Sequence, residues 1–414
     1  RPLLWTAITV SLLGLFTATS YLGYWIIWPG TTVAGIPVGG MTPLAAVAKL
    51  REELLWDSRS VRLSAGPFET TAFLGFEIGI TPDIASSVEA CKRPIWRWNS
   101  SKNPPLNILV DDSKASLYAA SLASSWDATV EDATYHLTPD GEVVVLPDRY
   151  GCQVDIAALI LDLTNIVSMD DIPDSIEIPA RITSPNVLAT DLEAFLPMAL
   201  VSEYSTRYAD KNNRAHNIAL ASSILTPTTV NPGQVFSFNK TTGPRSKEMG
   251  YLKAGVIIGD GLVDDYGGGV CQVSTTLYVA MLKAGFKVQE RYAHGIPVTY
   301  VPLGLDATVS YDYLDMKMKN AGDAPFVLAI YAVDGVLTAK VYGQDPGDFR
   351  IEVESSILKE IPAEPATADP DNPDDEQPRL RPGFLVETRV RYLKGDTLLK
   401  TERLNTSMYP PQKP

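Results

Sequence analysis

An uncharged stretch at the start of the chain constrains its organisation more than any other feature. No Asp, Glu, Lys or Arg occurs between Pro2 and Ala48, and Leu3–Trp28 is almost continuously apolar. This run exceeds the roughly 20 residues that a helix needs to span the hydrocarbon core of a bilayer. Its last residues include tyrosine and tryptophan, which favour the membrane interface. We therefore expect a transmembrane anchor over residues 1–28, a single-pass location in the cell membrane, and an exported body.

A cleaved signal peptide is the alternative interpretation of the same segment. Its apolar region would be shorter and would end in a cleavage site of small residues, whereas this run is long and ends in aromatic residues. Arg1 has the positive sign expected on the cytoplasmic side of an anchor.

The rest of the chain divides by composition into several parts. With 414 residues, two or three domains are expected. We expect a Gly/Pro/Thr-rich linker over 29–40, an α+β domain over 41–180, a second α+β domain over 190–343, and a small β-rich unit over 350–414. An acidic, Pro-rich loop interrupts the last unit. The predicted fold class is thus α+β and multidomain, with an N-terminal transmembrane helix.

Charge and cysteine content narrow the classes of function. The formal net charge is -14, and no cluster of Lys and Arg offers a face for phosphate, so we expect no nucleic-acid partner. Three cysteines in an exported chain suggest one disulfide and one remaining thiol. Cys91 and Cys152 could form the disulfide, which would leave Cys271 reduced; three unpaired, buried cysteines are the alternative.

A glycine run followed by a cysteine is the strongest chemical signal. The run Gly267–Gly269 precedes Cys271, and a helix is predicted from about Gln272 to Ala284. A helix N-terminus stabilises a thiolate, and its free N–H groups can bind an oxyanion. Glycines allow close approach of a substrate to the backbone. A buried cysteine in a tight turn would give the same local pattern.

A histidine and an aspartate follow on successive predicted strands. His294 is one of three histidines in the chain, and Asp306 comes 12 residues later. The order Cys, His, Asp is typical of cysteine hydrolases and transferases, in which His accepts the thiol proton and Asp orients the imidazole. A structural role at a strand edge for His294, or in a turn for Asp306, is the alternative. Asp265, Asp312 and Asp315 compete with Asp306 for this role.

Other polar residues near these motifs are candidates for substrate binding. Arg245 and Arg291 offer forks for a carboxylate, and Gln272 could add an oxyanion donor. The full candidate set is Gly268, Gly269, Gln272, Ser274, Arg291, Arg245 and Tyr251. One Cys and one His without paired spacing do not make a zinc site, so neither a metal nor another cofactor is expected.

Several long motifs, taken together, resemble one known family. The chain reads NIALA from Asn217, NPGQVFSFN from Asn231, GGGVCQVSTTLY from Gly267, ERYAH from Glu290 and YVPLGLDA from Tyr300. In this order and spacing the set looks like the VanW domain, over about 214–343. Residues 41–163 resemble the peptidoglycan-binding domain that often precedes VanW domains, and the C-terminal β unit is weakly similar to a G5 domain.

The resemblance implies a function on the cell-wall side of the membrane. Some VanW-family members are regarded as L,D-transpeptidases, which would make Cys271 the nucleophile and His294 the base. The implied reaction forms 3–3 cross-links between peptidoglycan stem peptides through a thioester. A cysteine peptidase or L,D-carboxypeptidase acting on stem peptides, and a non-catalytic peptidoglycan-binding adaptor, are the alternatives. The family often has Ser where Gly295 follows the histidine, and a Gly-containing turn where this chain has Thr226-Pro227.

Overall fold

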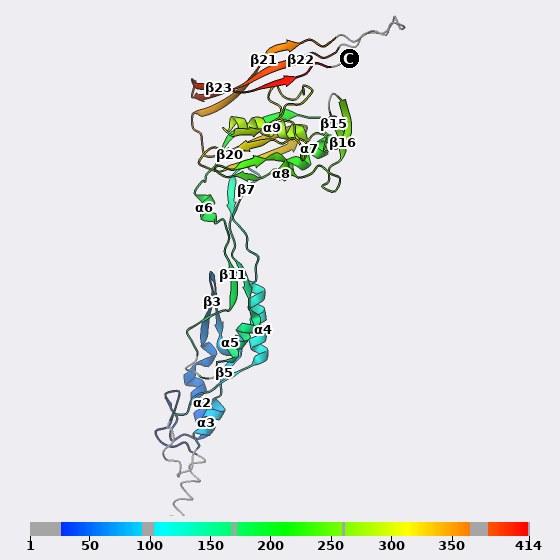
Figure 1. The fold of residues 1–414 in the computed structure, drawn as a ribbon. Helices are drawn as coiled ribbons and strands as arrows, with labels where there is room; N and C mark the ends of the chain where they lie inside the picture. The colour runs from blue at the N-terminus through cyan, green and yellow to red at the C-terminus, as the bar shows by residue number, and fades with distance from the viewer. Residues whose placement is uncertain are drawn as a thin grey trace, which may run out of the picture. The chain divides into compact units, whose positions relative to one another are not determined.

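The structure is a computed structural model that describes residues 26–92, 103–166, 168, 172–258, 261–364 and 380–412. The chain divides into two compact units. The first comprises Arg1–Asp132 with Asp148–Asn186, and the second comprises Ala133–Pro147 with Val187–Pro414. Figure 1 gives the element labels used below.

Helices of the first unit begin where the sequence supplies a side-chain cap. Thr42 Oγ1 accepts a hydrogen bond from the N–H of Ala45 at the start of α2 (Pro43–Leu54), and proline takes the first helical position. Aspartates cap the remaining longer helices, which are α3 (Ile84–Ala90), α4 (Asp112–Trp126) and α5 (Ile156–Thr164).

Strands of the first unit form small separate sheets. These are β1 (Thr32–Val33) with β2 (Ile36–Pro37); β3 (Ser60–Ala65) with β4 (Phe68–Phe73) and β10 (Ser175–Glu177); β5 (Ile80–Pro82) with β6 (Ile108–Val110); and β9 (Gly151–Val154) with β11 (Ala180–Thr183). Short helical turns, η1 (Trp56–Ser58) and η2 (Leu74–Ile78), connect β3 and β4 to their neighbours. Leu63, Leu74, Leu122 and Leu159 are buried together in one core.

Two predictions are corrected in this unit. The predicted transmembrane segment lies outside the described residues except for 26–28, which are not helical, and Ile27 is buried in the protein core with Val33 and Val38. The longest described helix, α4, has 15 residues. No described helix is long and apolar enough to cross a membrane. The fold class is therefore corrected to a mixed α/β multidomain chain with small sheets, and the prediction of a single-pass membrane location is withdrawn.

The Cys91–Cys152 disulfide is not formed. The two residues belong to different cores, Cys91 with Ile84 and Val88 and Cys152 with the leucine core above. Cys91 Sγ instead donates a hydrogen bond to the carbonyl of Ser87 at 3.2 Å. The three cysteines are therefore thiols.

Residues 133–147, which lie within the α+β domain expected over 41–180, form a hairpin that belongs to the second unit. It consists of β7 (Thr134–Leu137) and β8 (Val143–Leu146), with Gly141 in a left-handed conformation at its turn. Its Tyr135 and Val143 are buried against Val327 and Tyr342 of the second unit. In the chain order of the second unit, the short helix α6 (Ala189–Glu193) comes next after the hairpin.

The second unit is built around one buried helix, α9 (Val270–Lys283). From Val270 to Leu282 every residue except Cys271 is buried, as expected for a helix packed on all sides. A four-stranded antiparallel sheet lies on one side, in the order β12 (Ala199–Arg207), β20 (Val336–Gly343), β19 (Phe326–Val333) and β13 (Thr228–Val230). Helix α7 (Asn213–Ile224) packs beside α9 against β19.

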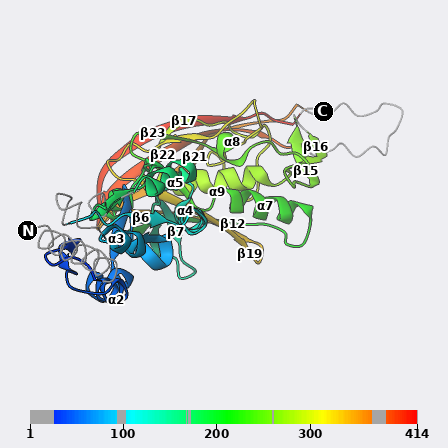
Figure 2. The same cartoon turned by 90° about the horizontal axis from the view of Figure 1, so that it is seen from below.

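A second sheet covers α9 from the other side. It contains β21 (Phe349–Ile361), β22 (Gly383–Lys394) and β23 (Thr397–Tyr409), paired antiparallel in that order. Strand β21 contacts α9 directly, and the long strands pass alongside it in Figures 1 and 2. Smaller elements complete the unit: the sheet β14 (Val235–Ser237), β18 (Lys317–Lys319) and β17 (Lys287–Glu290), the helix α8 (Phe238–Thr242), and the hairpin β15 (Lys253–Ile258) and β16 (Gly261–Tyr266).

Candidate active site

The glycine run places Cys271 in the first turn of α9. Gly269 is the N-cap residue, with φ 107°, a conformation that non-glycine residues rarely adopt. Gly268 packs directly on β15, since a Cβ there would lie 2.6 Å from the carbonyl carbon of Ala254. Cys271 itself is partly exposed, in contrast to the buried residues that follow it in the helix.

The N–H of Cys271 is available to bind an anion. The neighbouring N–H groups of Val270 and Gln272 donate to the carbonyls of Gly267 and Gly269 at 3.1 and 2.9 Å. Among the residues that the structure describes, no acceptor faces the N–H of Cys271. Free N–H groups at a helix N-terminus are suited to an oxyanion.

His294 lies near the thiol of Cys271, since each of the two side chains shifts the pKa of the other. The thiol donates to the carbonyl of Val309 at 3.4 Å and lies 3.6 Å from the hydroxyl of Thr308. His294 is buried, with 4% of its side chain exposed. Its ring Nδ1 lies 2.7 Å from Oδ2 of Asp306, which leaves the other ring nitrogen, Nε2, for Cys271. Asp306, rather than Asp265, Asp312 or Asp315, therefore orients the imidazole.

Asp306 is buried, and its carboxylate accepts hydrogen bonds from His294, Arg291 and Tyr409. Its Oδ2 accepts from the backbone N–H of His294 at 2.7 Å as well as from the ring. Its Oδ1 accepts from Nη2 of Arg291 at 2.9 Å and from the hydroxyl of Tyr409. With the side chain 1% exposed, the carboxylate charge is balanced by Arg291, as a buried ion requires.

The pKa values of the three groups shift in directions that favour an ion pair. Burial alone would raise the pKa of the Cys271 thiol, but the hydrogen bond and charge of His294 outweigh it and lower that pKa. Burial would likewise lower the pKa of His294, but its hydrogen bonds to Asp306 and Cys271 raise it to about 9. Burial opposes ionisation of Asp306, yet its hydrogen bond to His294 and the charge of Arg291 lower its pKa. The arrangement supports a thiolate beside an imidazolium.

Arg245 lies beside the glycine run on the thiol side. A Cβ on Gly267 would be 2.7 Å from Cβ and Cγ of Arg245, and the guanidinium interacts electrostatically with Cys271 and Tyr251. Its Nη1 and Nη2 donate to the carbonyl of Gly243 at 3.0 Å and to Oδ1 of Asn239 at 2.7 Å. Three of its five N–H groups therefore remain for a ligand. The hydroxyl of Tyr251 is buried and has no partner among the described residues.

Three other candidates for substrate binding are turned away from the thiol. Gln272 donates to Thr206 Oγ1 and to the carbonyl of Arg207 in β12, at 2.9 and 2.8 Å. Ser274 donates to the carbonyl of Ala307 at 2.6 Å and so holds the segment that carries Asp306. Arg291 donates to Asp306, to the carbonyl of Gly304 and to Ser407. These three side chains therefore stabilise the protein around the site through hydrogen bonds to neighbouring groups.

Two supporting residues were not identified from sequence. Asn217 on α7 is fully buried; it donates to the carbonyls of Leu252 and Gly268 at 2.8 and 3.0 Å and accepts from the N–H of Leu252. It therefore ties the glycine run to the neighbouring loop, and its place in the NIALA motif was the available signal. Tyr409 is 103 residues from Asp306, and no local pattern marks that contact. In the described part of the chain, no three His, Cys, Asp or Glu side chains are grouped to hold a metal.

Comparison with known proteins places this site in a VanW-like domain. Residues 213–342 match the family model "VanW like protein", and residues 85–172 match "Putative peptidoglycan binding domain". The chain is 34% identical over 197 residues to the "Uncharacterized protein YoaR" of Bacillus subtilis (strain 168), which covers 46% of this chain and 65% of that protein. It is 28% identical over 138 residues to the "Vancomycin B-type resistance protein VanW" of Enterococcus faecalis (strain ATCC 700802 / V583), covering 32% of this chain and 50% of that protein.

The chain thus carries a VanW-like domain and a match to a putative peptidoglycan-binding domain. It spans 65% and 50% of the lengths of these two relatives. No solved structure matches it significantly. The resemblance of residues 350–414 to a G5 domain remains a prediction.

Proposed function

We propose that the VanW-like domain is a cysteine acyltransferase that acts on peptidoglycan stem peptides, as an L,D-transpeptidase. The observation that carries the proposal is the grouping of three side chains at the N-terminus of a helix. His294 Nδ1 lies 2.7 Å from Asp306 Oδ2, and His294 lowers the pKa of the Cys271 thiol. A nucleophile, a base and an orienting carboxylate in this order are the machinery of acyl transfer.

The acylation half-reaction uses these groups in a fixed order. The thiolate of Cys271 attacks the carbonyl carbon of the third stem residue, a diaminopimelate or similar residue, and the oxyanion accepts a hydrogen bond from the free N–H of Cys271. The bond between that carbonyl and D-Ala then breaks. The imidazolium of His294 gives its proton to the leaving amine, which leaves a thioester on Cys271 and a neutral imidazole.

The second half-reaction transfers the acyl group to a neighbouring stem. A side-chain amine attacks the thioester carbonyl, His294 takes a proton from that amine, and the carbon–sulfur bond breaks. A 3–3 amide cross-link forms, and the thiolate–imidazolium pair is restored. With water in place of the amine, the same steps would give an L,D-carboxypeptidase.

Arg245 supports a substrate that carries carboxylates. Its guanidinium lies within electrostatic range of the thiol and keeps unused N–H groups. A planar guanidinium binds a carboxylate through two parallel hydrogen bonds. The carboxylate of the leaving D-Ala, or that of the third stem residue, is the group we assign to Arg245.

The decisive test is mass-spectrometric analysis of muropeptides from cells that lack other L,D-transpeptidases. Cells expressing the wild-type chain are expected to contain 3–3 dimers, and cells expressing Cys271→Ala are expected to lack them. Tripeptide monomers without dimers would instead indicate the carboxypeptidase.

Binding to purified, insoluble peptidoglycan is the matched control. Because the peptidoglycan-binding family match covers residues 85–172, far in sequence from Cys271, the Cys271→Ala variant should sediment with the wall as well as the wild type. Identical muropeptides in both strains, with wall binding intact, would contradict the enzyme and favour an adaptor.

A further inference from the structure

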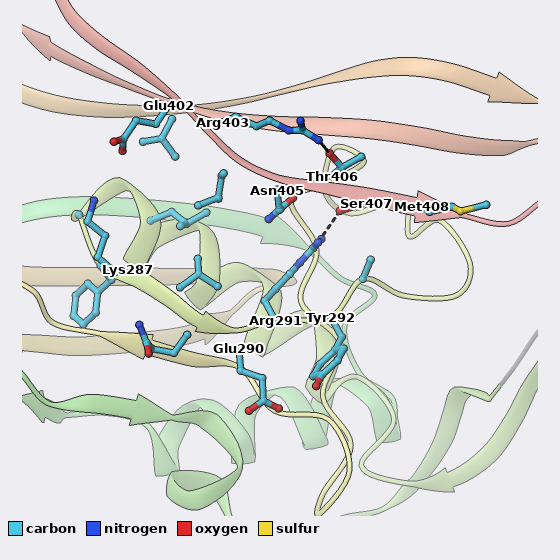
Figure 3. Close-up of a pocket in the computed structure, with 18 of the residues that line it drawn as sticks. Lys287, Glu290, Arg291, Tyr292, Glu402, Arg403, Asn405, Thr406, Ser407 and Met408 are labelled. Atoms are coloured by element: carbon cyan, nitrogen blue, oxygen red, sulfur yellow. Dashed lines mark hydrogen bonds between the residues drawn. The ribbon is translucent and has the colours of Figure 1, made fainter.

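The last strand of the chain presents alternate side chains to the site. Along β23, Ser407 and Tyr409 are buried, with 3% and 0% exposure, whereas Met408 between them is 61% exposed. Residues two apart on a strand share a face, so Asn405, Ser407 and Tyr409 all point inward. Figure 3 shows Ser407 directed at Arg291 from this strand, and both residues line a pocket of about 940 Å³.

These inward side chains contact the groups that hold His294. The hydroxyl of Tyr409 donates to Oδ1 of Asp306 and accepts from the N–H of Gly304 at 2.7 Å. Ser407 Oγ accepts from Nη1 of Arg291 at 2.6 Å. One strand thus binds the orienting carboxylate, its counter-ion and the start of the loop between Gly304 and Asp306.

The neighbouring strand β22 fixes the same loop. Thr388 Oγ1 donates to the carbonyl of Gly304 at 3.0 Å. Gly304 has φ 90°, and a Cβ there would lie 2.8 Å from Oγ1 of Thr388. Both backbone polar groups of Gly304 are therefore bonded to the C-terminal sheet, two residues before Asp306.

A buried carboxylate keeps one orientation only while both oxygens have donors. Oδ2 of Asp306 is held by His294, and Oδ1 is held by Arg291 and Tyr409. Without the hydroxyl of Tyr409, Oδ1 would keep Arg291 alone, and Arg291 is itself held by Ser407 of the same strand. A carboxylate that can rotate no longer fixes the imidazole.

We propose that the C-terminal sheet completes the active site, with Tyr409 as a positioning residue that fixes Asp306 through its hydroxyl. The proposal rests on the function proposed above for Cys271 and His294. The VanW-like match ends at residue 342, so the residues that complete the site lie beyond the matched domain.

The test is the pH dependence of Cys271 alkylation in the whole chain, with the modified residue assigned by peptide mass spectrometry. Only the thiolate alkylates, so the midpoint of rate against pH reports the ionisation of Cys271. Tyr409→Phe removes the hydroxyl and keeps the ring. Its midpoint should rise by about half to one pH unit, since weaker hydrogen bonding to the His–Asp pair disfavours the charged form.

Tyr135→Phe is the matched control. Tyr135 is also buried in the second unit, and its hydroxyl donates to the carbonyl of Leu192 at 2.9 Å in a different core. Loss of that hydroxyl should lower thermal stability as Tyr409→Phe does and leave the alkylation midpoint unchanged.

The outcomes separate this inference from the proposed function. A low midpoint in the wild type that stays the same in Tyr409→Phe would mean that Tyr409 is merely structural. A wild-type midpoint at the ordinary value for cysteine would overturn the proposed function, and this inference with it. A rise in both Tyr409→Phe and Ser407→Ala, with Tyr135→Phe at the wild-type midpoint, supports the inference.

Discussion

One oxygen of Asp306, Oδ2, accepts hydrogen bonds from both the backbone N–H and the ring Nδ1 of His294, each at 2.7 Å. Two donors from one residue fix the position of the imidazole as well as its orientation. With Nδ1 bonded to the carboxylate, Nε2 is the nitrogen that faces Cys271. The histidine is therefore oriented to exchange a proton with the thiol.

Replacing this carboxylate with an amide should disable the site. In Asp306→Asn, the buried charge that balances Arg291 is lost and one amide edge becomes a donor. We expect alkylation of Cys271 at pH 6 to slow by about 10-fold or more, and stability to fall by roughly 2–4 kcal/mol. Alkylation rates and urea unfolding measure the two effects.

The control for this change is Asp312→Asn. Asp312 is exposed and close in sequence, so both measurements should match the wild type. Equal alkylation rates in Asp306→Asn and Asp312→Asn would show that Asp306 does not support the thiol.

Turnover should have a bell-shaped dependence on pH. Because His294 lowers the pKa of Cys271, the acid limb should lie below the ordinary range of a thiol, where the thiolate takes up a proton. His294 has a pKa of about 9, so above that pH it can no longer protonate the leaving amine, and turnover should fall. The alkaline limb should be absent from alkylation, which needs no leaving-group proton.

His294→Gln tests the source of the acid limb. Without the imidazolium, burial raises the pKa of Cys271, and the alkylation midpoint should move up by at least one pH unit. The rate should be followed from pH 5 to pH 10. An unchanged midpoint would mean that the helix N-terminus alone activates the thiol.

The sequence indicated Cys271 and His294 more clearly than it indicated the residues around them. Cys271 follows glycines at a helix start, and His294 is rare enough to stand out, so local features predicted both. Gln272 was misjudged because adjacent residues on a helix point about 100° apart, which directs it at β12. Arg291 has the right chemistry for a carboxylate, but the carboxylate it binds is Asp306. That partner depends on tertiary packing, which no local pattern contains.

The fold, too, combines features that local sequence predicts with features that depend on contacts between distant parts of the chain. Capped helices such as α2 and the hairpin around Gly141 follow from local signals. The assignment of that hairpin to the second unit depends on contacts with Tyr342, about 200 residues away in the chain. The transmembrane prediction rested on the apolar length, the aromatic residues at the end of the run and the charge of Arg1, and Ile27 near that end is buried by protein.

Arg245 should contribute to substrate binding more than to thiol activation. Arg245→Lys keeps the charge and loses the bidentate fork. We expect KM for a tetrapeptide donor to rise by about 10-fold or more, with the Cys271 alkylation midpoint shifted little. Arg391→Lys, a change at a partly exposed ion pair with Glu352 and Glu354, is the control and should leave KM unchanged. A fall in kcat at constant KM would contradict a role in binding.

The glycine run should tolerate no side chain at Gly268. In Gly268→Ala the new Cβ would meet the carbonyl carbon and oxygen of Ala254 at 2.6 Å and the oxygen of Gly255 at 2.7 Å. These are backbone atoms of β15, so either the strand or the start of α9 must shift. We expect a loss of about 2–3 kcal/mol in unfolding free energy, in the range for overpacking, and slower alkylation as Cys271 moves away from His294.

Gly322→Ala provides the comparison within the same unit. Its Cβ would be 3.4 Å from Oδ1 of Asn320, an ordinary contact with a side chain, so stability should change by less than about 0.5 kcal/mol. Urea unfolding of both variants, with alkylation of Cys271 measured in the folded state, checks the expectation. If Gly268→Ala unfolds like Gly322→Ala and alkylates at the wild-type rate, the close packing of the glycine run on β15 is not what positions the thiol.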